Sequence, residues 1–238
     1  MNKIRIIRVF VFVIVNVIVN ALASCSTTAG LSDGEVLYTG LKSIDHNNHD
    51  KSLHYRETKD EVEASLATAP NGALFGSSYY RTPFPYGLWV WNKWHDSNSP
   101  VAKWIVKSFG KAPVLMQNVK PNVRAVITRN VLENNGYFHG KVDYQIIPQK
   151  NPKKAKVQYT VDYGQLFTLD TIFYSNFPHE TWEKLIRTKS LLHTGDPFSV
   201  ETLDNERTRI SNTLQNSGYY FYQKEYMSYL ADTIQKPG

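Results

Sequence analysis

The sequence predicts an α+β fold made of two similar units, each ordered strand, helix, helix, strand, strand, with the second unit incomplete. Stretches whose apolar residues follow helical spacing alternate with stretches in which every second residue is apolar. The segment 132–138 (LENNGYF) is repeated 82 residues later as 214–220 (LQNSGYY). In both copies a helical pattern ends on glycine, and an aromatic pair leads into a strand pattern. Solenoid repeats follow one another about every 20–50 residues, so a spacing of 82 residues indicates tandem small domains instead.

The first 24 residues have the composition of a secretory signal peptide. Three basic residues precede an apolar run over 9–19, and the run leads to the small residues Ala23 and Ser24. Cys25 follows directly. This arrangement resembles the lipobox of bacterial lipoproteins, which implies that Cys25 is lipidated and becomes the first residue of the mature protein. The alternative is a transmembrane helix, but the run is short for a bilayer span and is interrupted by Asn16.

Composition indicates a folded chain of modest charge. Hydrophobic residues make up 42% of the sequence and aromatic residues 13%, which is typical of a protein with a packed core. The formal net charge of +6 falls to 24 − 21 = +3 without the three basic residues of the signal, too little to indicate a nucleic-acid partner. Cys25 is the only cysteine, so we expect no disulfide within the chain. The polar stretch over 25–35 is predicted to be a tether.

The first predicted unit covers 36–164. A strand is predicted over 36–44, where apolar residues alternate, and a polar loop over 46–55. A helix is expected to begin at Thr58, because Glu61 three residues later would complete a capping box.

An insertion rich in aromatic residues interrupts the first unit over about 70–117. Prolines divide it into short pieces, and two short helices are predicted near 85–95 and 100–109. The insertion contains four of the five tryptophans, Trp89, Trp91, Trp94 and Trp104. These side chains either cover the sheet as additional core or contact a membrane or a partner, and both interpretations stay open.

A second helix is predicted after Pro121, with a C-cap at Gly136. Its expected apolar stripe is Val123, Val126, Ile127 and Val131. Alternating apolar residues then predict strands over 142–146 and 157–163, joined by a turn into a hairpin. The turn is rich in lysine, which favours a solvated tip over contact with anionic lipid.

The second predicted unit covers 165–238. A strand is expected over 166–174, a short helix over 178–187 and one strand within 219–234. Between them a helix should begin after Ser199, a suitable N-cap. Its expected buried stripe is Leu203, Arg207, Ile210 and Leu214.

The order of these elements, with Gly-Tyr after the second helix, resembles the POTRA domain. POTRA domains form the periplasmic arm of the BamA and TamA superfamily of outer-membrane assembly and translocation factors. The lipobox, together with 74–77 (LFGS), 81–89 (RTPFPYGLW) and 109–115 (FGKAPVL), resembles the TamA-like lipoproteins of Bacteroidetes, called TamL. The resemblance implies that the second unit lacks its third strand, the central one of the sheet. It also implies an N-terminal fragment of a protein that continues into a barrel.

The sequence offers no pattern typical of catalysis, so we expect neither an enzyme nor a cofactor. A cluster of His46, His49 and His54 with Asp45 and Asp50 lies in the predicted polar loop. Without helical spacing these residues favour a solvated loop over a metal site, and no metal is expected. The carboxylates Glu201, Asp204 and Glu206 are expected on the polar side of their helix, facing water.

The resemblance also implies a partner-binding edge. In the family the second strand is a sheet edge, which can pair with an extended polypeptide by β-augmentation. That strand corresponds here to Lys141, Val142, Asp143, Tyr144, Gln145, Ile146 and Ile147, with a counterpart near 225–232. The partners implied are a TamB-like periplasmic protein or unfolded outer-membrane proteins, and the outer membrane itself through lipidated Cys25. We therefore expect the protein on the periplasmic face of the outer membrane.

The alternative function is a free-standing periplasmic lipoprotein that binds a glycan or a peptide through its aromatic block. This alternative would need amide or carboxylate groups that converge near the tryptophans.

Overall fold

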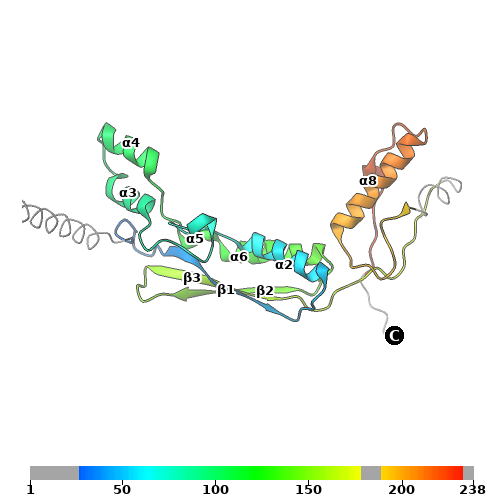
Figure 1. Cartoon of the computed structure of the whole chain (residues 1–238), viewed down its shortest axis with the longest axis horizontal. Helices are drawn as coiled ribbons and strands as arrows, with labels where there is room; N and C mark the ends of the chain where they lie inside the picture. Colours follow the sequence, from blue (N-terminus) through cyan, green and yellow to red (C-terminus); the bar gives the residue numbers. More distant parts are fainter. Residues whose placement is uncertain (1–26, 178–188, 233–238) are drawn as a thin grey trace, which may run out of the picture. The chain divides into compact units, whose positions relative to one another are not determined.

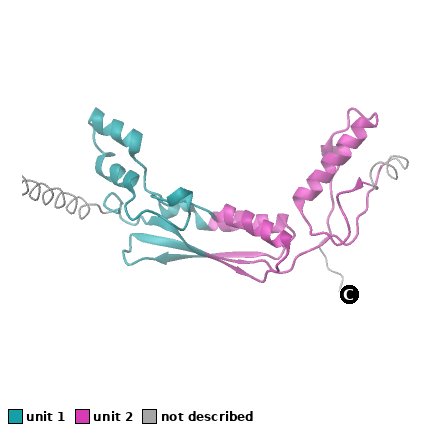
Figure 2. Cartoon of the chain, in the orientation of Figure 1, with its two compact units in different colours: residues 1–43, 67–121, 144–158 teal, residues 44–66, 122–143, 159–238 magenta. Residues whose placement is uncertain are grey.

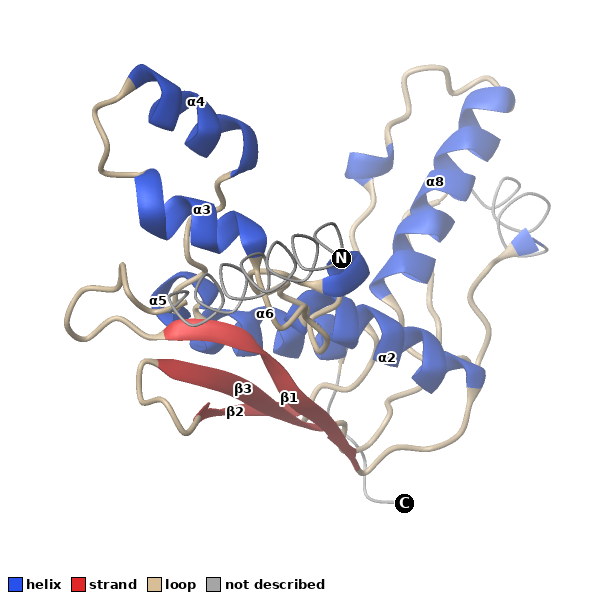
Figure 3. Cartoon of the chain, turned by 60° about the vertical axis from the view of Figure 1, so that its left-hand side comes forward, coloured by secondary structure: helices blue, strands red, loops and turns tan. Residues whose placement is uncertain are grey.

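The computed structural model describes residues 27–177 and 189–232, and this part of the chain is an α+β protein, as predicted (Figure 1). Its sheet consists of β1 (Leu37–Asn47), β2 (Lys141–Pro148) and β3 (Lys154–Asp162) in the order β1-β3-β2. Figure 3 shows β3 between the other two. The hairpin prediction is confirmed, because Gln149 N donates to Lys154 O at 2.9 Å across the turn that joins β2 to β3.

The central position of β3 explains its sequence. Every second residue of β3 is buried, from Ala155 to Val161, and the residues between them are partly exposed. This alternation is expected for a strand with neighbours on both sides and one face covered. The buried face is therefore specified by the sequence pattern alone.

By its internal contacts the described chain divides into two compact units (Figure 2). Unit 1 comprises the described residues of 1–43, 67–121 and 144–158, and unit 2 comprises those of 44–66, 122–143 and 159–238. All three strands pass from one unit into the other. The predicted domain boundary after residue 164 stays a prediction.

Unit 1 contains the aromatic insertion. Its two predicted helices are confirmed as α3 (Tyr86–Trp94) and α4 (Pro100–Phe109), followed by the short α5 (Met116–Val119). A 3-10 turn, η1 (Leu74–Gly76), precedes them. A small core joins α3 to the start of β1 through Leu31, Leu37, Leu88 and Leu115.

The residues before β1 pack against the domain rather than forming a free tether. Thr28 and Leu31 are buried, and Lys153 Nζ donates to Leu31 O at 3.2 Å. The tether prediction for 25–35 is therefore wrong for its described part, because Leu31 is an apolar anchor within a polar stretch.

Unit 2 contains α2 (Leu53–Leu66) and α6 (Pro121–Asn134), which lie over one face of the strand ends of this unit (Figure 2). Beneath them, Tyr163 makes edge-to-face ring contacts with Tyr55 at 5.0 Å and with Tyr137 at 5.2 Å. Aromatic pairs of this geometry bury large apolar area, so these tyrosines form the centre of the core.

The first helix and strand are both longer than predicted. β1 continues to Asn47, and α2 begins at Leu53 instead of Thr58. The cap is Ser52, whose Oγ accepts a hydrogen bond from Tyr55 N at 3.0 Å. Thr58 is buried inside the helix and donates to His54 O at 2.9 Å. The Thr58–Glu61 spacing imitates a capping box but does not mark the helix start.

For α6 the helix is confirmed but the predicted face is wrong. Val123, Val126 and Ile127 are about half exposed, at 45%, 50% and 49%. The buried face carries Ala125, Thr128 and Leu132 instead. Thr128 Oγ1 lies 2.7 Å from Ser65 Oγ of α2. The face that contacts α2 therefore differs from the one that the valine and isoleucine spacing predicted.

The long helix of the second predicted unit is confirmed as α8 (Val200–Asn216), and Ser199 Oγ accepts from Thr202 N at 3.3 Å as its N-cap. Both repeat glycines have the positive φ that a C-cap requires, 85° at Gly136 and 103° at Gly218. A Cβ at Gly136 would also lie 2.9 Å from Phe198 O, so this position excludes a side chain. The prediction that the two glycines have the same backbone role is thus confirmed.

Two predicted strands of this region are wrong. Over 166–174 the chain forms only a bridge between Thr168 and Pro197, and 225–232 contains no strand. The bridge is made by backbone hydrogen bonds from Phe198 N to Phe167 O at 3.0 Å and from Leu169 N to Asp196 O at 2.8 Å. A strand needs a longer run of such partners for its backbone groups. The chain after Gly218 instead folds back on α8, where Met227 packs on Ile210 and Leu214. The helix predicted over 178–187 lies outside the described residues.

Candidate partner-binding surfaces

The predicted partner-binding strand forms an edge of the sheet. β2 has β3 on one side, and no other described segment makes a backbone hydrogen bond with it. A free edge presents unpaired N–H and C=O groups, which can accept another strand. Lys141, Asp143, Tyr144, Gln145 and Ile146 are exposed, and Val142 and Ile147 are partly exposed.

The first part of the opposite sheet edge, over 37–41 of β1, is covered. Tyr38 N donates to Val114 O and Leu41 N donates to Ser78 O, both at 2.8 Å. The acceptors belong to the insertion, so the insertion occupies the outer edge of β1. Gly40 makes this approach possible, because its φ is 111° and a Cβ there would lie 2.5 Å from Ser78 O. The insertion thus protects the first part of the β1 edge, whereas no described segment bonds to the β2 edge.

The hydrogen-bond pattern of a hairpin shows which groups of β2 are free. In an antiparallel pair, every second residue bonds to the neighbouring strand and the residues between them point outward. Gln149 N donates toward β3, to Lys154 O. Alternation along β2 therefore directs the amides of Val142, Tyr144 and Ile146 away from β3. Three donors spaced two residues apart are what an added strand requires.

The sequence at the two ends of β2 limits unspecific pairing. Lys141 at its start is charged, and Pro148 at its end has no N–H. Beside Ile146 lies a shallow hollow of about 140 Å³, lined also by Val36 and Met116.

The four tryptophans of the insertion do not form the main core of unit 1. That role belongs to Leu88 and Val90 of α3, which are 1% and 0% exposed. Trp89 and Trp94 are half-buried against each other, with ring centroids 5.4 Å apart. The third tryptophan of α3, Trp91, stacks on His95. Trp104 of α4 is 62% exposed.

The three histidines of the loop-region cluster have separate partners. His46 contacts Tyr163 Oη at 3.0 Å and Glu63 Oε1 at 3.2 Å, and burial lowers its pKa. His54 Nε2 lies 2.8 Å from Asn135 O, whereas His49 stacks on Tyr55. Among the described residues no group of three or more histidine, cysteine and carboxylate side chains could hold a metal ion.

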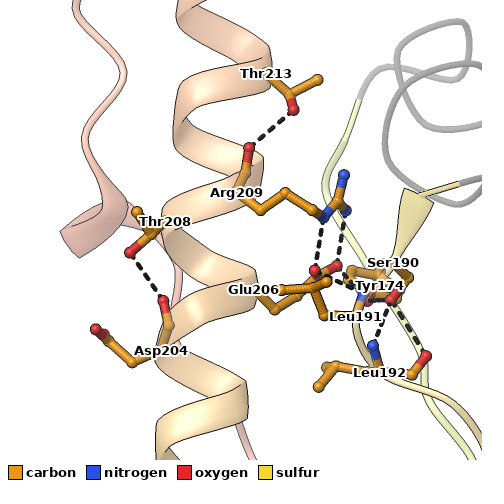
Figure 4. Close-up of polar contacts among 9 residues, drawn as sticks. All are labelled: Tyr174, Ser190, Leu191, Leu192, Asp204, Glu206, Thr208, Arg209 and Thr213. Carbon is orange, nitrogen blue, oxygen red and sulfur yellow. Dashed lines mark hydrogen bonds and ion pairs between the residues drawn. The ribbon is translucent and has the colours of Figure 1, made fainter.

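Unit 2 contains a polar cluster that the sequence prediction missed (Figure 4). Glu206 of α8 is fully buried, although the sequence suggested a carboxylate facing water. Arg209 donates two hydrogen bonds to it, at 2.7 and 2.8 Å. Tyr174 Oη donates at 2.9 Å and Leu191 N at 3.0 Å. The carboxylate therefore joins α8 to two segments of the preceding chain.

The protonation states in this cluster follow from its contacts. Burial by itself would raise the pKa of Glu206, but the hydrogen bonds from Arg209, the Leu191 amide and Tyr174 outweigh it, and the net pKa is lowered. Burial raises the pKa of Tyr174 to about 12. Glu206 is thus ionised and Tyr174 neutral at pH 7, as a carboxylate acceptor and a hydroxyl donor require.

One sequence signal for this cluster existed. Glu206 lies three residues after Leu203 and four before Ile210, within the apolar stripe predicted for α8. A carboxylate in that stripe, followed three residues later by Arg209, indicates a buried pair rather than a solvated face.

The predicted lipidation site, Cys25, lies outside the described residues. Within them, no helix is long and apolar enough to cross a membrane. Compared with models of protein families and with curated proteins, the sequence matches none. Any assignment of function therefore depends on the chemistry of the surfaces above.

Proposed function

We propose that this chain is a lipid-anchored POTRA-like module that binds extended polypeptides at the free edge of β2. The observation that carries the proposal is the asymmetry of the sheet. The insertion occupies the outer edge of β1, whereas the described chain leaves β2 open. A protein that only needed to avoid aggregation would be expected to cover both edges.

The arrangement of elements supports the POTRA part of the proposal. The third strand lies between the first and the second, the position that the resemblance implies. The helices α2 and α6 lie over one face of the strand ends in unit 2. Gly136 and Gly218 end corresponding helices with positive φ, which supports a repeated unit.

The mechanism is β-augmentation. An unfolded outer-membrane strand, or a segment of a TamB-like partner, would donate and accept backbone hydrogen bonds along β2. Each such bond contributes on the order of 1 kcal/mol, so a few outward amides and carbonyls give modest, reversible affinity. Because backbone groups carry this affinity, one edge can accept many sequences.

The cellular placement rests on Cys25. Lipidation there would hold the module on the periplasmic face of the outer membrane, close to arriving substrates. Metabolic labelling with a fatty-acid analogue tests this placement: the wild type should incorporate label and Cys25→Ala should not. Equal label in both proteins would show that Cys25 is not the lipidation site, and the proposal for the β2 edge would be unaffected.

The glycan-binding alternative receives less support. Sugars stack on free aromatic faces, but Lys93 Nζ lies 5.1 Å from the centre of the Trp89 ring and 4.8 Å from that of Trp94. A cation over these rings competes with a sugar for the same faces.

A matched pair of substitutions at Ile146 tests the edge. Ile146→Pro removes an outward N–H, whereas Ile146→Thr shortens the apolar side chain and keeps the N–H. The probe is a labelled peptide of about ten residues, the length of a membrane strand, in which valine alternates with threonine. Fluorescence anisotropy should show that the proline variant loses about tenfold or more in affinity, and the threonine variant clearly less.

Thermal unfolding of both variants provides the control for folding. Equal affinity of the wild type and a folded Ile146→Pro variant would show that the peptide binds elsewhere. An equal loss in both variants would assign the affinity to the side chain rather than to the strand edge.

A further inference from the structure

The outer helix of the insertion exposes apolar side chains. In α4, Val101 is 66% exposed, Trp104 62% and Phe109 50%, and Trp104 and Phe109 contact each other edge to face with centroids 6.1 Å apart. The opposite face of the helix is more buried, with Ala102 only 6% exposed. Side chains this large rarely stay in water together without a binding role.

Positive charge surrounds this apolar face. Lys103 and Lys107 lie on α4 itself, and both are exposed. Across the whole α3–α4 hairpin, over 86–111, four lysines accompany a single carboxylate, Asp96. That carboxylate lies in the turn between the helices and pairs with His95 Nε2 at 3.3 Å. The surface therefore complements an anionic partner.

The hairpin is fixed to the segment that leads back to Cys25. Leu31 packs in one cluster with Leu88 of α3. Leu31 is six residues after Cys25, and six extended residues span at most about 20 Å. With the lipid anchor of the proposed function at Cys25, the hairpin must stay close to the bilayer surface.

We propose that α4 is a membrane-surface contact that binds the interface of an anionic phospholipid bilayer. Tryptophan and phenylalanine favour the boundary between headgroups and acyl chains, and lysines beside them attract anionic headgroups. The ten residues of α4 are too short to cross a bilayer, so the helix lies along the surface. With the lipid anchor at Cys25, α4 gives the module a second point of attachment to the membrane. Two attachment points restrict the rotation of the module relative to the bilayer.

The test needs a local reporter, because the apolar run over 9–19 could itself bind vesicles. The chain with Cys25→Ser has no cysteine, so Ser108→Cys introduces a single labelling site on α4, one turn after Trp104. An environment-sensitive fluorophore there should shift to shorter wavelength with vesicles of phosphatidylglycerol and phosphatidylcholine. The same label at Asn212→Cys, exposed on α8, should not shift.

Matched variants separate the two contributions. Lys103→Gln with Lys107→Gln should raise the vesicle concentration for half-maximal shift about thirtyfold, because each lysine near an anionic surface contributes on the order of 1 kcal/mol. The control, Lys42→Gln with Lys51→Gln, removes the same charge elsewhere and should change little. Trp104→Ser should reduce the shift, whereas Phe221→Ser, at an exposed aromatic position outside the insertion, should not.

The proposal is overturned by no shift at position 108, by equal shifts at 108 and 212, or by a shift that survives loss of Trp104 and both lysines. Binding of a soluble protein at α4 without any vesicle response would also overturn it. Because the tested chain lacks Cys25, the outcome does not depend on lipidation. A negative result in the peptide-binding experiment at Ile146 would not affect the proposal that α4 contacts the membrane surface.

Discussion

At the scale of single residues, Glu206 shows how a buried charge can organise a weakly structured region. The described chain around it has little regular structure apart from α8, and its apolar cluster is small. The carboxylate compensates by accepting four hydrogen bonds, from Arg209 twice, Tyr174 and Leu191. A buried ion is stable only when its hydrogen-bonding capacity is filled, and here it is.

Glu206→Ala is therefore expected to destabilise this region strongly. Removing one partner of a buried pair leaves Arg209 uncompensated, and such losses are about 3–5 kcal/mol. Asp204→Asn on the same helix is the control, and it should cost much less because the Asp204 side chain is 46% exposed. Chemical unfolding followed by circular dichroism measures both. Equal losses would mean that burial of Glu206 has no special energetic role.

The same carboxylate predicts a pH dependence. Because its folded pKa is lowered, its contribution is complete above the unfolded value of 4.5 and is lost as pH falls through the folded pKa. The stability difference between wild type and Glu206→Gln should accordingly be largest near pH 7 and shrink below about pH 4.5. A difference that stays constant from pH 7 to pH 3 would contradict the ionised state assigned here.

At the scale of elements, one buried side chain bridges the two ends of the insertion. Asn71 is 5% exposed, and its amide donates to Ala112 O at 2.8 Å while its carbonyl accepts from Val114 N at 2.7 Å. It thus ties the beginning of the insertion to its end, beside the segment that covers β1.

Asn71→Ala should loosen this cover. Two backbone groups in part-buried hydrogen bonds, Ala112 O and Val114 N, would lose their partner, at a cost of about 1 kcal/mol each. Amide hydrogen exchange should accelerate at Tyr38 and Leu41, whose N–H groups bond to the insertion. The exposed Asn98→Ala is the matched control. Unchanged exchange at Tyr38 would show that the insertion covers β1 without help from Asn71.

The two faces of α6 provide another element-scale prediction. Leu132 is 0% exposed and Ile127 is 49% exposed. Leu132→Ala should cost about 2–5 kcal/mol through the cavity it leaves, whereas Ile127→Ala should change stability by no more than about 0.5 kcal/mol. Thermal unfolding of the two variants decides. A large loss of stability in Ile127→Ala would mean that the face predicted from the sequence pattern is the buried one.

At the scale of the whole molecule, the sequence predicts well where local patterns and final packing agree. The alternation in β3, the helices of the insertion and the two C-cap glycines carry strong local signals, and all appear in the structure. The sequence prediction fails where contacts with residues distant in the sequence determine the structure. The buried face of α6 depends on close contact with Ser65 of α2, and the strand expected over 166–174 lacks a full partner in the described chain.

The candidate site was predictable only in part. The β2 edge was expected from the resemblance to the POTRA domain. The covering of β1 by the insertion was not, since it depends on the positive φ of Gly40 and on pairing across more than 35 residues. Glu206 was missed because a carboxylate on a helix ordinarily faces water.

The most direct test of the central claim is amide hydrogen exchange, resolved by residue, with and without the alternating strand peptide. The proposal predicts that protection rises at Val142, Tyr144 and Ile146, whose N–H groups point away from β3. Tyr38 and Leu41, already bonded to the insertion, should not change. Protection that rises at Tyr38 and Leu41 instead, or peptide binding with no change along β2, would contradict the claim that β2 is the binding edge.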